Sequence, residues 1–444
     1  MGRYFGTDGI RGEANKTLTV HTAFKIGQFL GHYYKTEQKG KVLIGKDTRI
    51  SSSMLEHALI AGICSGGSDA YLMHVGPTPA VAYLARTHDF NCGVMISASH
   101  NPYYDNGIKI FDHSGTKIAD DLEAQLEDYI DDEFRLPLAS DTMIGESIDF
   151  RQGLDDYLNW MEHLFEFDLK GYRVIIDVAN GSATTTAKRL LEKLGADVIS
   201  MYDTPNGVNI NNHCGSTHPD NLQKAVLKHK ANFGFAFDGD ADRLIAVDEL
   251  GQLVDGDKIM YACGVYLNRK KLLKKNTVVA TVMSNLGLFK ALNHMNVSVV
   301  QTQVGDKYVY QQMIQDDYTL GGEQSGHIIF KDLATTGDGL LTAMKLIEVV
   351  VSQQQPLSDI VKPCQAFPQV LKNVSVKDKK SVLNDLEINQ LIVAINDDLN
   401  DSGRILVRPS GTESLVRVMV EADQVDKCHH YVDQVIDMIV MKGL

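Results

Sequence analysis

The stretch Cys92-Gly93-Val94-Met95-Ile96-Ser97-Ala98-Ser99-His100-Asn101-Pro102 is an apolar run that ends abruptly in small and polar residues. Its first five residues have the composition of a buried β-strand. Pro102 cannot continue that strand, because proline lacks the N–H group that a sheet needs. The pattern therefore predicts a strand whose tip exposes the hydroxyl group of Ser99. Such a hydroxyl can act as a nucleophile or carry a phosphoryl group.

Two residues close to Ser99 are candidates for its chemistry. His100 follows directly, but neighbours on an extended chain point to opposite sides, so this adjacency alone does not make a catalytic pair. Lys109 comes ten residues later, and a hairpin-like return of the chain would bring its ammonium group near Ser99. The alternatives are a plain turn at residues 97–102, since serine, asparagine and proline are common in turns, and a solvated lysine.

Strand and helix patterns alternate around this stretch. In chain order they fall at residues 41–45, 52–64, 71–75, 80–86 and 92–96. Such a βαβαβ order favours a mainly parallel sheet with helices on both faces. A helical pattern at 121–130 and the acidic residues after it close a first domain near residue 150.

The same alternation begins again twice further along the chain. Strands are expected at 172–177 and 196–201 around a helix at 182–194, and a third unit begins with a strand at 276–280. Residues 352–363 are polar and contain proline, which is typical of a linker.

The last part of the chain differs from the three α/β units. Strands at 405–407 and 415–420, followed by a helix at 425–441, predict a small α+β domain. The 444 residues are too many for one core, so several domains are required. We predict three similar mixed α/β domains and a smaller C-terminal α+β domain, at residues 1–150, 151–253, 254–366 and 367–444.

The composition excludes several classes of protein. A formal net charge of −14 argues against general nucleic-acid binding, and an anionic substrate would need locally basic loops. The six cysteines have no CxxC spacing, so reduced thiols are expected rather than a disulfide framework or a zinc site. The sequence has neither a signal-type leader nor a run of about 18 apolar residues, so we expect a cytoplasmic protein without a membrane span.

A second constellation is Phe237-Asp238-Gly239-Asp240-Ala241-Asp242-Arg243, which places three carboxylates within five residues. Carboxylates at this spacing repel one another unless a cation lies among them. On extended backbone all three would point to the same side, which suits Mg²⁺ with positions left for a phosphoryl oxygen. Arg243 would compensate charge or contact a bound phosphate.

An EF-hand calcium loop is one alternative for these aspartates, because they fill its first, third and fifth positions and Glu249 its twelfth. The sixth position of that loop needs glycine, whereas this chain has Arg243 there. The flanking residues 232–237 and 244–247 also predict strands rather than helices. A solvated acidic turn is the other alternative.

Two loops are candidates for binding an anion or a sugar. Arg408-Pro409-Ser410-Gly411-Thr412-Glu413-Ser414 combines hydroxyls, a glycine N–H and an arginine, and Arg417 can add a second cation. In Gly321-Gly322-Glu323-Gln324-Ser325-Gly326-His327, Glu323 and Ser325 would project the same way on an extended chain and can bind vicinal hydroxyls. The alternative for each is an ordinary connecting loop.

A third glycine-rich segment lies near the start of the chain. Gly6-Thr7-Asp8-Gly9-Ile10-Arg11-Gly12 can bind phosphate; the alternative is a flexible leader, although such leaders rarely carry isoleucine and arginine between glycines. Lys46 and Arg49, at the end of the first long strand, add two more cations to the expected site.

Taken together, these segments resemble the α-D-phosphohexomutase superfamily over essentially the whole chain. The matching segments occur in one order: Gly6–Gly12, Ser97–Pro102, Asp238–Arg243, Gly322–His327 and Arg408–Glu413. The details of Ile96–Lys109 and Gly321–His327 are most similar to the bacterial members that act on glucosamine phosphates.

The resemblance implies roles for individual residues in four domains around a central cleft. Ser99 would be the phosphorylated serine, and this phosphorylation would be required for activity. One Mg²⁺ per chain would be held by Ser99, Asp238, Asp240 and Asp242. Substrate contacts would come from Arg243, Lys307, Glu323, Ser325, Arg408, Ser410, Gly411, Thr412 and Arg417. Candidate catalytic residues besides Ser99 are Lys109, Arg11, His100 and His327.

The implied reaction interconverts glucosamine 6-phosphate and glucosamine 1-phosphate through phosphoserine and a 1,6-bisphosphate. It would feed the synthesis of UDP-N-acetylglucosamine and cell-wall precursors. A homodimer is compatible with the resemblance. Lys307 stands where family members commonly have arginine, which keeps the charge but loses the bidentate fork.

Three other functions stay open at this point. The first is the same chemistry on glucose or mannose phosphates. The second is a metal-dependent phosphatase that forms a seryl phosphate, and the third is a catalytically silent protein that binds sugar phosphates.

Overall fold

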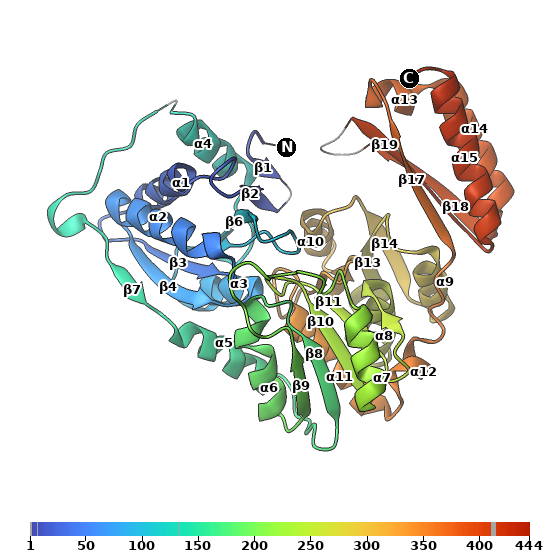
Figure 1. Ribbon diagram of the computed structural model, residues 1–444, viewed down its shortest axis with the longest axis horizontal. Coiled ribbons are helices and arrows are strands. Elements are labelled where there is room, and N and C mark those ends of the chain that lie inside the picture. Colours follow the sequence, from blue (N-terminus) through green and yellow to red (C-terminus); the bar gives the residue numbers. More distant parts are fainter. Residues whose placement is uncertain (1, 7, 133, 410–413) are drawn as a thin grey trace. The chain divides into compact units, whose positions relative to one another are not determined.

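The structure is a computed structural model that describes residues 2–6, 8–132, 134–409 and 414–444 (Figure 1). The chain divides into two compact units, each described here by itself. The first consists of Met1–Met283 and Val297–Lys362, and the second of Ser284–Asn296 and Pro363–Leu444. The first unit contains three sheets of seven, five and four strands, and the second contains one sheet of three strands.

The seven-stranded sheet carries the Ser99 stretch. Its strand order is β1-β2-β6-β5-β3-β4-β7. The strands span Phe5–Gly6 (β1), Gly9–Glu13 (β2), Lys41–Lys46 (β3), Asp69–Val75 (β4), Cys92–Ile96 (β5), Asp105–Asp112 (β6) and Ser147–Asp149 (β7). Its helices span Val20–Tyr33 (α1), Ile50–Gly66 (α2), Thr78–Thr87 (α3) and Asp120–Ile130 (α4).

This sheet has a smaller share of parallel strand pairs than the sequence pattern indicated. β5, β3, β4 and β7 pair in parallel, as expected from the βαβ connections. The other three pairs are antiparallel, because β6 returns directly from the tip of β5 and then pairs with the β1–β2 hairpin. The turn between β5 and β6 therefore contains Ser99.

The second sheet places the aspartate loop. Its strand order is β12-β11-β10-β8-β9. The strands span Arg173–Asp177 (β8), Asp197–Met201 (β9), Phe233–Phe237 (β10), Leu244–Val247 (β11) and Leu253–Val254 (β12). Its helices are Gln152–His163 (α5), Ala187–Lys193 (α6) and Asp220–His229 (α7). The helix expected at 182–194 is instead a 3₁₀ turn followed by α6, since Thr186 lies outside the helical region at φ −127°.

The third sheet has the order β14-β13-β15-β16. Its strands span Thr277–Thr281 (β13), Ser298–Thr302 (β14), Leu320–Gly322 (β15) and Ile328–Phe330 (β16). Its helices are Gly256–Arg269 (α8), Asp306–Gln315 (α10), Gly339–Gln353 (α11) and Leu357–Val361 (α12). The linker expected at 352–363 was therefore wrong. That segment holds the end of α11 and α12, and it buries Leu357, Ile360 and Val361.

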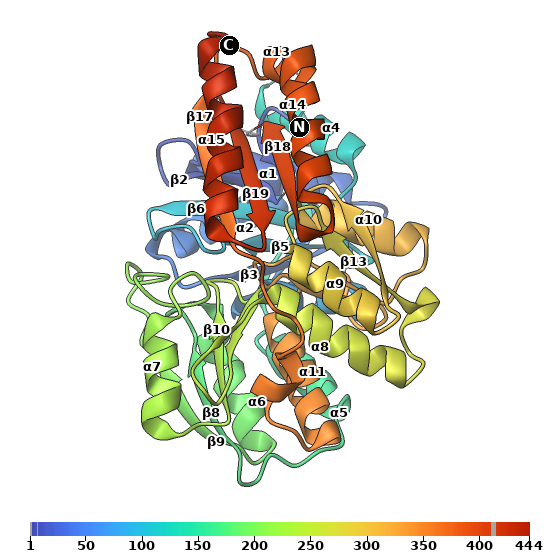
Figure 2. The ribbon, with the colours of Figure 1, turned by 90° about the vertical axis from the view of Figure 1, so that its right-hand side faces the viewer.

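The second unit is the predicted small α+β domain, with one addition. Its antiparallel sheet β17-β19-β18 is formed by Gln369–Ser375, Leu415–Ala422 and Gly403–Pro409, respectively. Lys379–Asn384 (α13), Leu386–Leu399 (α14) and Val425–Met441 (α15) complete it, and α14 and α15 lie on one face of the sheet (Figures 1 and 2). The addition is Leu286–His294 (α9), whose first N–H group donates to Glu421 on β19.

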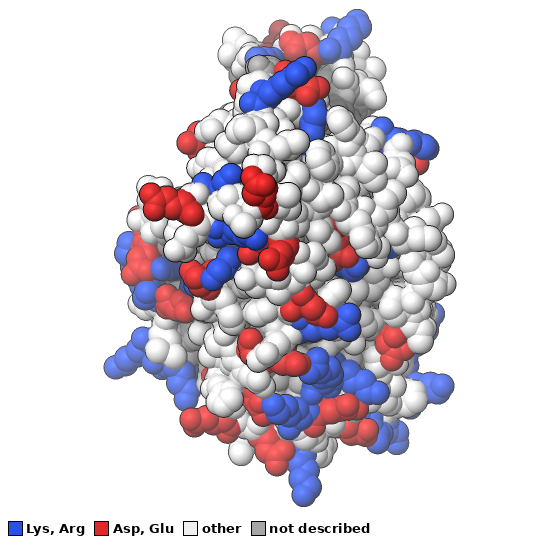
Figure 3. All heavy atoms as spheres, turned by 90° about the vertical axis from the view of Figure 1, so that its left-hand side faces the viewer, with Lys and Arg blue, Asp and Glu red and all other residues white. Residues whose placement is uncertain are grey.

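The surface carries charges of both signs. Acidic and basic side chains are interspersed on the face shown in Figure 3. Among the residues that the structure describes, no helix combines the length and hydropathy that a membrane span requires.

Close contact between α1 and α2 depends on glycine. A Cβ atom at Gly62 would lie 2.2 Å from the Phe24 carbonyl oxygen, and one at Gly27 would lie 2.3 Å from the Leu59 carbonyl oxygen. The two helices thus pack backbone to backbone over the core that supports β3 and β5.

The substitution Gly62→Ala tests this packing. Alanine favours a helix by about 1 kcal/mol over glycine, but the added methyl group has no room against α1. We expect the free energy of unfolding to fall by about 2 kcal/mol, measured by denaturant-induced unfolding. An unchanged or raised value, as helix propensity alone predicts, would contradict the packing argument.

Candidate active site

Ser99 lies at the tip of β5 with its side chain buried. Its backbone is in the left-handed region at φ 51°, which is uncommon for a residue with a Cβ atom. Its hydroxyl donates a hydrogen bond to Asp238 Oδ2 at 2.5 Å, although the two residues are 139 positions apart. The first and second sheets therefore meet at this serine.

The left-handed backbone also brings His100 to Ser99, against the expectation that these neighbours point apart. His100 Nδ1 lies 3.2 Å from Ser99 Oγ. Burial, with the charges of Arg243 and Arg11, lowers the pKa of His100 to about 4. The imidazole is therefore neutral near pH 7, next to the hydroxyl group.

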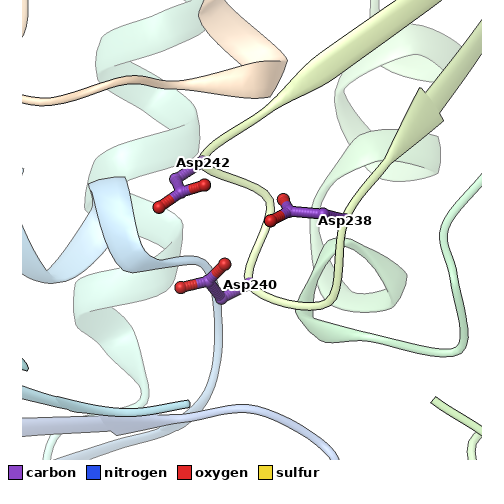
Figure 4. A group of neighbouring side chains, drawn as sticks. All are labelled: Asp238, Asp240 and Asp242. Carbon is purple, nitrogen blue, oxygen red and sulfur yellow. The ribbon is translucent and has the colours of Figure 1, made fainter. Parts of the chain in front are cut away.

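The three aspartates converge in the loop between β10 and β11 (Figure 4). One carboxylate oxygen of each lies within 4.8 Å of the others, and all three residues are buried. The loop is a turn, with Ala241 at φ 57°, and not the extended backbone that the sequence analysis assumed. The strands on both sides leave no room for the helix pair of an EF-hand.

The aspartate triad has the properties of a site for a divalent cation. Burial and the charges of Asp242 and Asp240 raise the pKa of Asp238 well above its usual range. A cation bound beside the carboxylates would lower that pKa again. Asp240 Oδ1 and Asp242 Oδ1 are buried without a hydrogen-bond partner among the described residues. The other oxygen of Asp240 accepts the hydroxyl of Thr78 at 2.5 Å. Oriented carboxylates with free oxygens suit a hard cation.

Lys109 and Ser99 both contact the aspartate triad, and the ammonium group of Lys109 lies against the carboxylates. Its ammonium group lies 2.8 Å from Asp240, 3.1 Å from Asp242 and 2.9 Å from Asp8. Burial opposes its charge, but these aspartates outweigh burial and raise the pKa of Lys109 well above its usual range. Lys109 therefore compensates the negative charge of the triad.

A chain of alternating charges continues from Lys109. Asp8 also pairs with Lys117 at 3.0 Å and with Arg11, and Lys117 reaches Asp306 at 2.6 Å. Burial opposes the charge of Asp8, but Lys109, Lys117 and Arg11 outweigh it and hold the pKa of Asp8 well below its usual range. Asp8, Lys117 and Asp306 were not predicted as site residues from the sequence. In the sequence, only the charged residues that stand among the glycines at 6–12 indicated that such a network exists.

Asp8 and Asp306 of this network line a cavity of about 380 Å³. The predicted residues Arg11, Arg243, Glu323 and His327 line it, together with Asp242. His327 Nε2 accepts the Gly337 N–H at 2.9 Å, which places the imidazole proton on Nδ1, 3.6 Å from Asp242. A polar, charged cavity beside a buried nucleophile suits an anionic, hydroxyl-rich substrate.

Four of the residues singled out from the sequence do not line this cavity. Lys307 pairs with Asp120 and lines a neighbouring cavity of about 330 Å³ instead. Lys46 pairs with Glu56, and Arg49 is buried against Asp47, so neither faces the cavity. Ser325 is exposed in a turn and is not part of the cavity wall.

Glu323 also departs from the expected extended chain, because it precedes that turn. Its Oε1 accepts the Gly305 N–H at 3.0 Å, which fixes the carboxylate at the cavity wall. The second oxygen of a carboxylate held in this way can accept a sugar hydroxyl.

In the second unit, Arg408 and Arg417 are directly paired across β18 and β19. Burial and the neighbouring charge of Arg417 lower the pKa of Arg408. Two guanidinium groups at paired positions of neighbouring strands favour the binding of an anion. Ser410, Gly411 and Thr412, which were expected in the same phosphate loop, lie outside the described residues.

Four family models match consecutive parts of the chain. They describe α/β/α domains I, II and III and the C-terminal domain of phosphoglucomutase/phosphomannomutase, and they match residues 2–136, 155–251, 255–367 and 371–438. The chain belongs to the phosphoglucomutase/phosphomannomutase family. The resemblance found in the sequence is thereby confirmed, as is the fold of three larger mixed α/β domains and a smaller C-terminal one.

Curated relatives of this family member are similar over their full length. A phosphoglucosamine mutase of Lachnoclostridium phytofermentans is 50% identical over 444 residues, covering 100% of this chain and 99% of the relative. A phosphoglucosamine mutase of Bacillus cereus is 48% identical and covers 99% of this chain and 98% of the relative.

Solved structures with lower identity share the fold. A phosphoglucomutase/phosphomannomutase family protein of Burkholderia thailandensis has a TM-score of 0.79 at 23% identity, covering 99% of this chain and 96% of the other. An N-acetylphosphoglucosamine mutase of Aspergillus fumigatus, solved with GlcNAc-6P and magnesium, has a TM-score of 0.71 at 18% identity, with the same coverage.

The substitution Asp240→Asn tests the cation site. Loss of one carboxylate should weaken binding of a divalent cation by about tenfold or more, measured with Mn²⁺ by titration calorimetry. Asp248→Asn is the matched control, because Asp248 is buried in the same domain but accepts only nearby backbone N–H groups. Equal affinities in the two variants would show that the triad does not hold the cation.

Proposed function

We propose that this protein is a phosphoglucosamine mutase, which interconverts glucosamine 6-phosphate and glucosamine 1-phosphate. The observation that carries the proposal is the Ser99 hydroxyl, held 2.5 Å from Asp238 beside the aspartate triad and the charged cavity. The choice of sugar is supported by the names of relatives that are 46–50% identical over essentially the whole chain.

The working form of the enzyme carries a phosphoryl group on Ser99. A phosphoryl dianion cannot lie among three buried carboxylates unless positive charge accompanies it. Asp238, Asp240 and Asp242 would hold one Mg²⁺, which supplies that charge and polarises the phosphoryl oxygens. Lys109 neutralises the same cluster from the side of β6.

In the first half of the reaction, O1 of glucosamine 6-phosphate attacks the phosphorus atom on Ser99. The bond between phosphorus and Ser99 Oγ breaks, and the bond to O1 forms, which gives glucosamine 1,6-bisphosphate. A base takes the O1 proton, and Ser99 Oγ regains a proton. The candidate imidazoles are His100, whose Nδ1 lies 3.2 Å from Ser99 Oγ, and His327, which lines the cavity, while Arg11 and Arg243 would balance charge on the phosphoryl oxygens.

In the second half the bisphosphate turns over within the site. Its 6-phosphoryl group returns to Ser99, and glucosamine 1-phosphate leaves. Because either end of the sugar must be held while the other reacts, a second phosphate site is needed, for which we propose Arg408, Arg417 and residues 410–412. Glu323, at the cavity wall, would bind the sugar hydroxyls.

Each of the four domains supplies one part of the site, and we propose domain boundaries at residues 150, 253 and 366. The first supplies the phosphoserine, the second the cation site, the third the sugar loop and the fourth the second phosphate loop. We also propose that the enzyme works in the cytoplasm and that its product feeds UDP-N-acetylglucosamine synthesis.

The substitution Ser99→Ala tests the phosphoryl carrier. Without Oγ no phosphoryl group can be held covalently, so mutase turnover should fall by about 10³-fold or more while the fold persists. Intact mass should show about 80 Da extra on the active wild-type protein, absent from the variant. Ser298→Ala removes a hydroxyl at an exposed position at the start of β14 and serves as the control. Substantial turnover by the Ser99→Ala variant would refute the role of this serine.

A comparison of three substrates tests the choice of sugar. The phosphorylated enzyme should turn over glucosamine 6-phosphate with a kcat/KM about tenfold or more above those for glucose 6-phosphate and mannose 6-phosphate. A tenfold preference for a sugar without the amino group would support a phosphoglucomutase or phosphomannomutase instead. Inorganic phosphate released faster than isomerised sugar would indicate a phosphatase.

A further inference from the structure

The backbone of Ser99 needs support that the phosphoryl chemistry does not explain. A serine at φ 51° lies in a region that side chains with a Cβ atom disfavour, so surrounding groups must hold it there. The segment from Ser97 to Asp105, called here the Ser99 loop, is the part of the chain that must be held.

Arg49 contacts the backbone carbonyl groups of the Ser99 loop and does not line the cavity. Its side chain is fully buried. Nη2 donates to the carbonyl oxygens of Ser99 at 3.0 Å and Asn101 at 2.8 Å, and Nη1 donates to those of Pro102 and of Asp105, the latter at 3.0 Å. Nε donates to Asp47 Oδ2 at 2.8 Å. A guanidinium group has five N–H donors, and all five are used here.

Asp47 connects the same arginine, through the Ser97 hydroxyl, to the N–H group of Ser99. Its Oδ2 also accepts the Ser97 hydroxyl at 2.7 Å, and that hydroxyl oxygen accepts the Ser99 N–H at 3.0 Å. The parallel pairing of β3 and β5 brings the two segments together, since the Asp47 N–H donates to the Ile96 carbonyl at 3.0 Å. One buried ion pair thus holds both the N–H and the carbonyl group of Ser99.

A residue of the second domain also donates a hydrogen bond to the Ser99 carbonyl group. Asn211 Nδ2 donates to the carbonyl oxygens of Ser99 at 2.8 Å and Asn101 at 3.0 Å. Gly239, between two of the aspartates, permits this approach, because a Cβ atom there would lie 2.5 Å from the Ser99 carbonyl oxygen. The Ser99 carbonyl therefore receives two donors, one from each domain, and its peptide plane cannot rotate without breaking both bonds.

We propose that Arg49 is a positioning residue, which fixes the carbonyl groups of the Ser99 loop so that Ser99 Oγ faces the aspartate triad. The structural part of this proposal stands on the contacts alone, and its kinetic consequence rests on the proposed function. In that reaction the sugar turns over between two transfers while Ser99 stays in place. An Oγ atom displaced by about 1 Å would lower the rate of both transfers by about a hundredfold.

Lysine cannot replace Arg49 in this role, although it keeps the charge. A lysine ammonium group is a compact donor of three hydrogen bonds, whereas the planar guanidinium reaches four carbonyl groups and a carboxylate. In Arg49→Lys at least two of the five bonds are lost. The variant retains the balance of charge with Asp47, so its effects report on geometry.

Crystal structures and kinetics of the wild type and Arg49→Lys test the proposal. We expect Ser99 to leave the left-handed region and its Oγ to lose the contact with Asp238. We also expect kcat to fall about a hundredfold with KM within about threefold, since residues lining the cavity are unchanged. Arg173→Lys is the control, because Arg173 likewise bonds a carboxylate and a carbonyl group but is half-exposed at the edge of the second domain.

Three results would overturn the role of Arg49. These are an unmoved Ser99 in the variant, an unchanged kcat despite a moved Ser99, and an equal loss of kcat in Arg173→Lys. Failure of the wild type to turn over any sugar phosphate would contradict the proposed function alone, because the crystallographic comparison does not depend on turnover.

A smaller change in the same network covers the case in which Arg49→Lys does not fold. Ser97→Ala removes the hydroxyl that joins Asp47 to the Ser99 N–H, without changing any charge. A moved Ser99 and a kcat lowered about tenfold would support the proposal, and an unmoved Ser99 with full activity would overturn it.

Discussion

The charge balance around three buried aspartates is the constraint on which the candidate site depends. Carboxylates within 4.8 Å of one another in a dry environment cannot all stay ionised without cations beside them. Lys109 meets part of that need from the first domain, and Arg243 adds a second positive charge. Asp240 Oδ1 and Asp242 Oδ1 have no hydrogen-bond partner among the described residues, and a divalent cation bound there would complete the balance.

This constraint also explains why residues from distant parts of the sequence are brought together. β6 supplies Lys109, the tip of β5 supplies Ser99, and the loop after β10 supplies the aspartates. The antiparallel return from β5 to β6 pairs Lys109 with Met95, four residues before the serine. Phosphoryl transfer needs little more from a protein than such positioning and compensation of charge.

Features formed by neighbouring residues were easier to predict than contacts between residues far apart in the sequence. The strand at 92–96, the serine at its tip and the convergence of the aspartates followed from local patterns. The contact of His100 with Ser99 was missed, because a left-handed serine leaves no mark in the composition. The Asp8–Lys117–Asp306 network joins segments nearly 300 residues apart, and no local pattern reports such pairs. The buried α12 was taken for a linker because polar residues and a proline precede it.

The central claim is that Ser99 passes its phosphoryl group to a sugar and recovers one from the same sugar. Protein carrying radiolabelled phosphate on Ser99, mixed with an equal amount of unlabelled glucosamine 6-phosphate, tests this directly. We expect the label to move to glucosamine bisphosphate and monophosphate at the rate of turnover, while the protein stays phosphorylated. Label that remains on the protein, or that leaves only as inorganic phosphate, would contradict it.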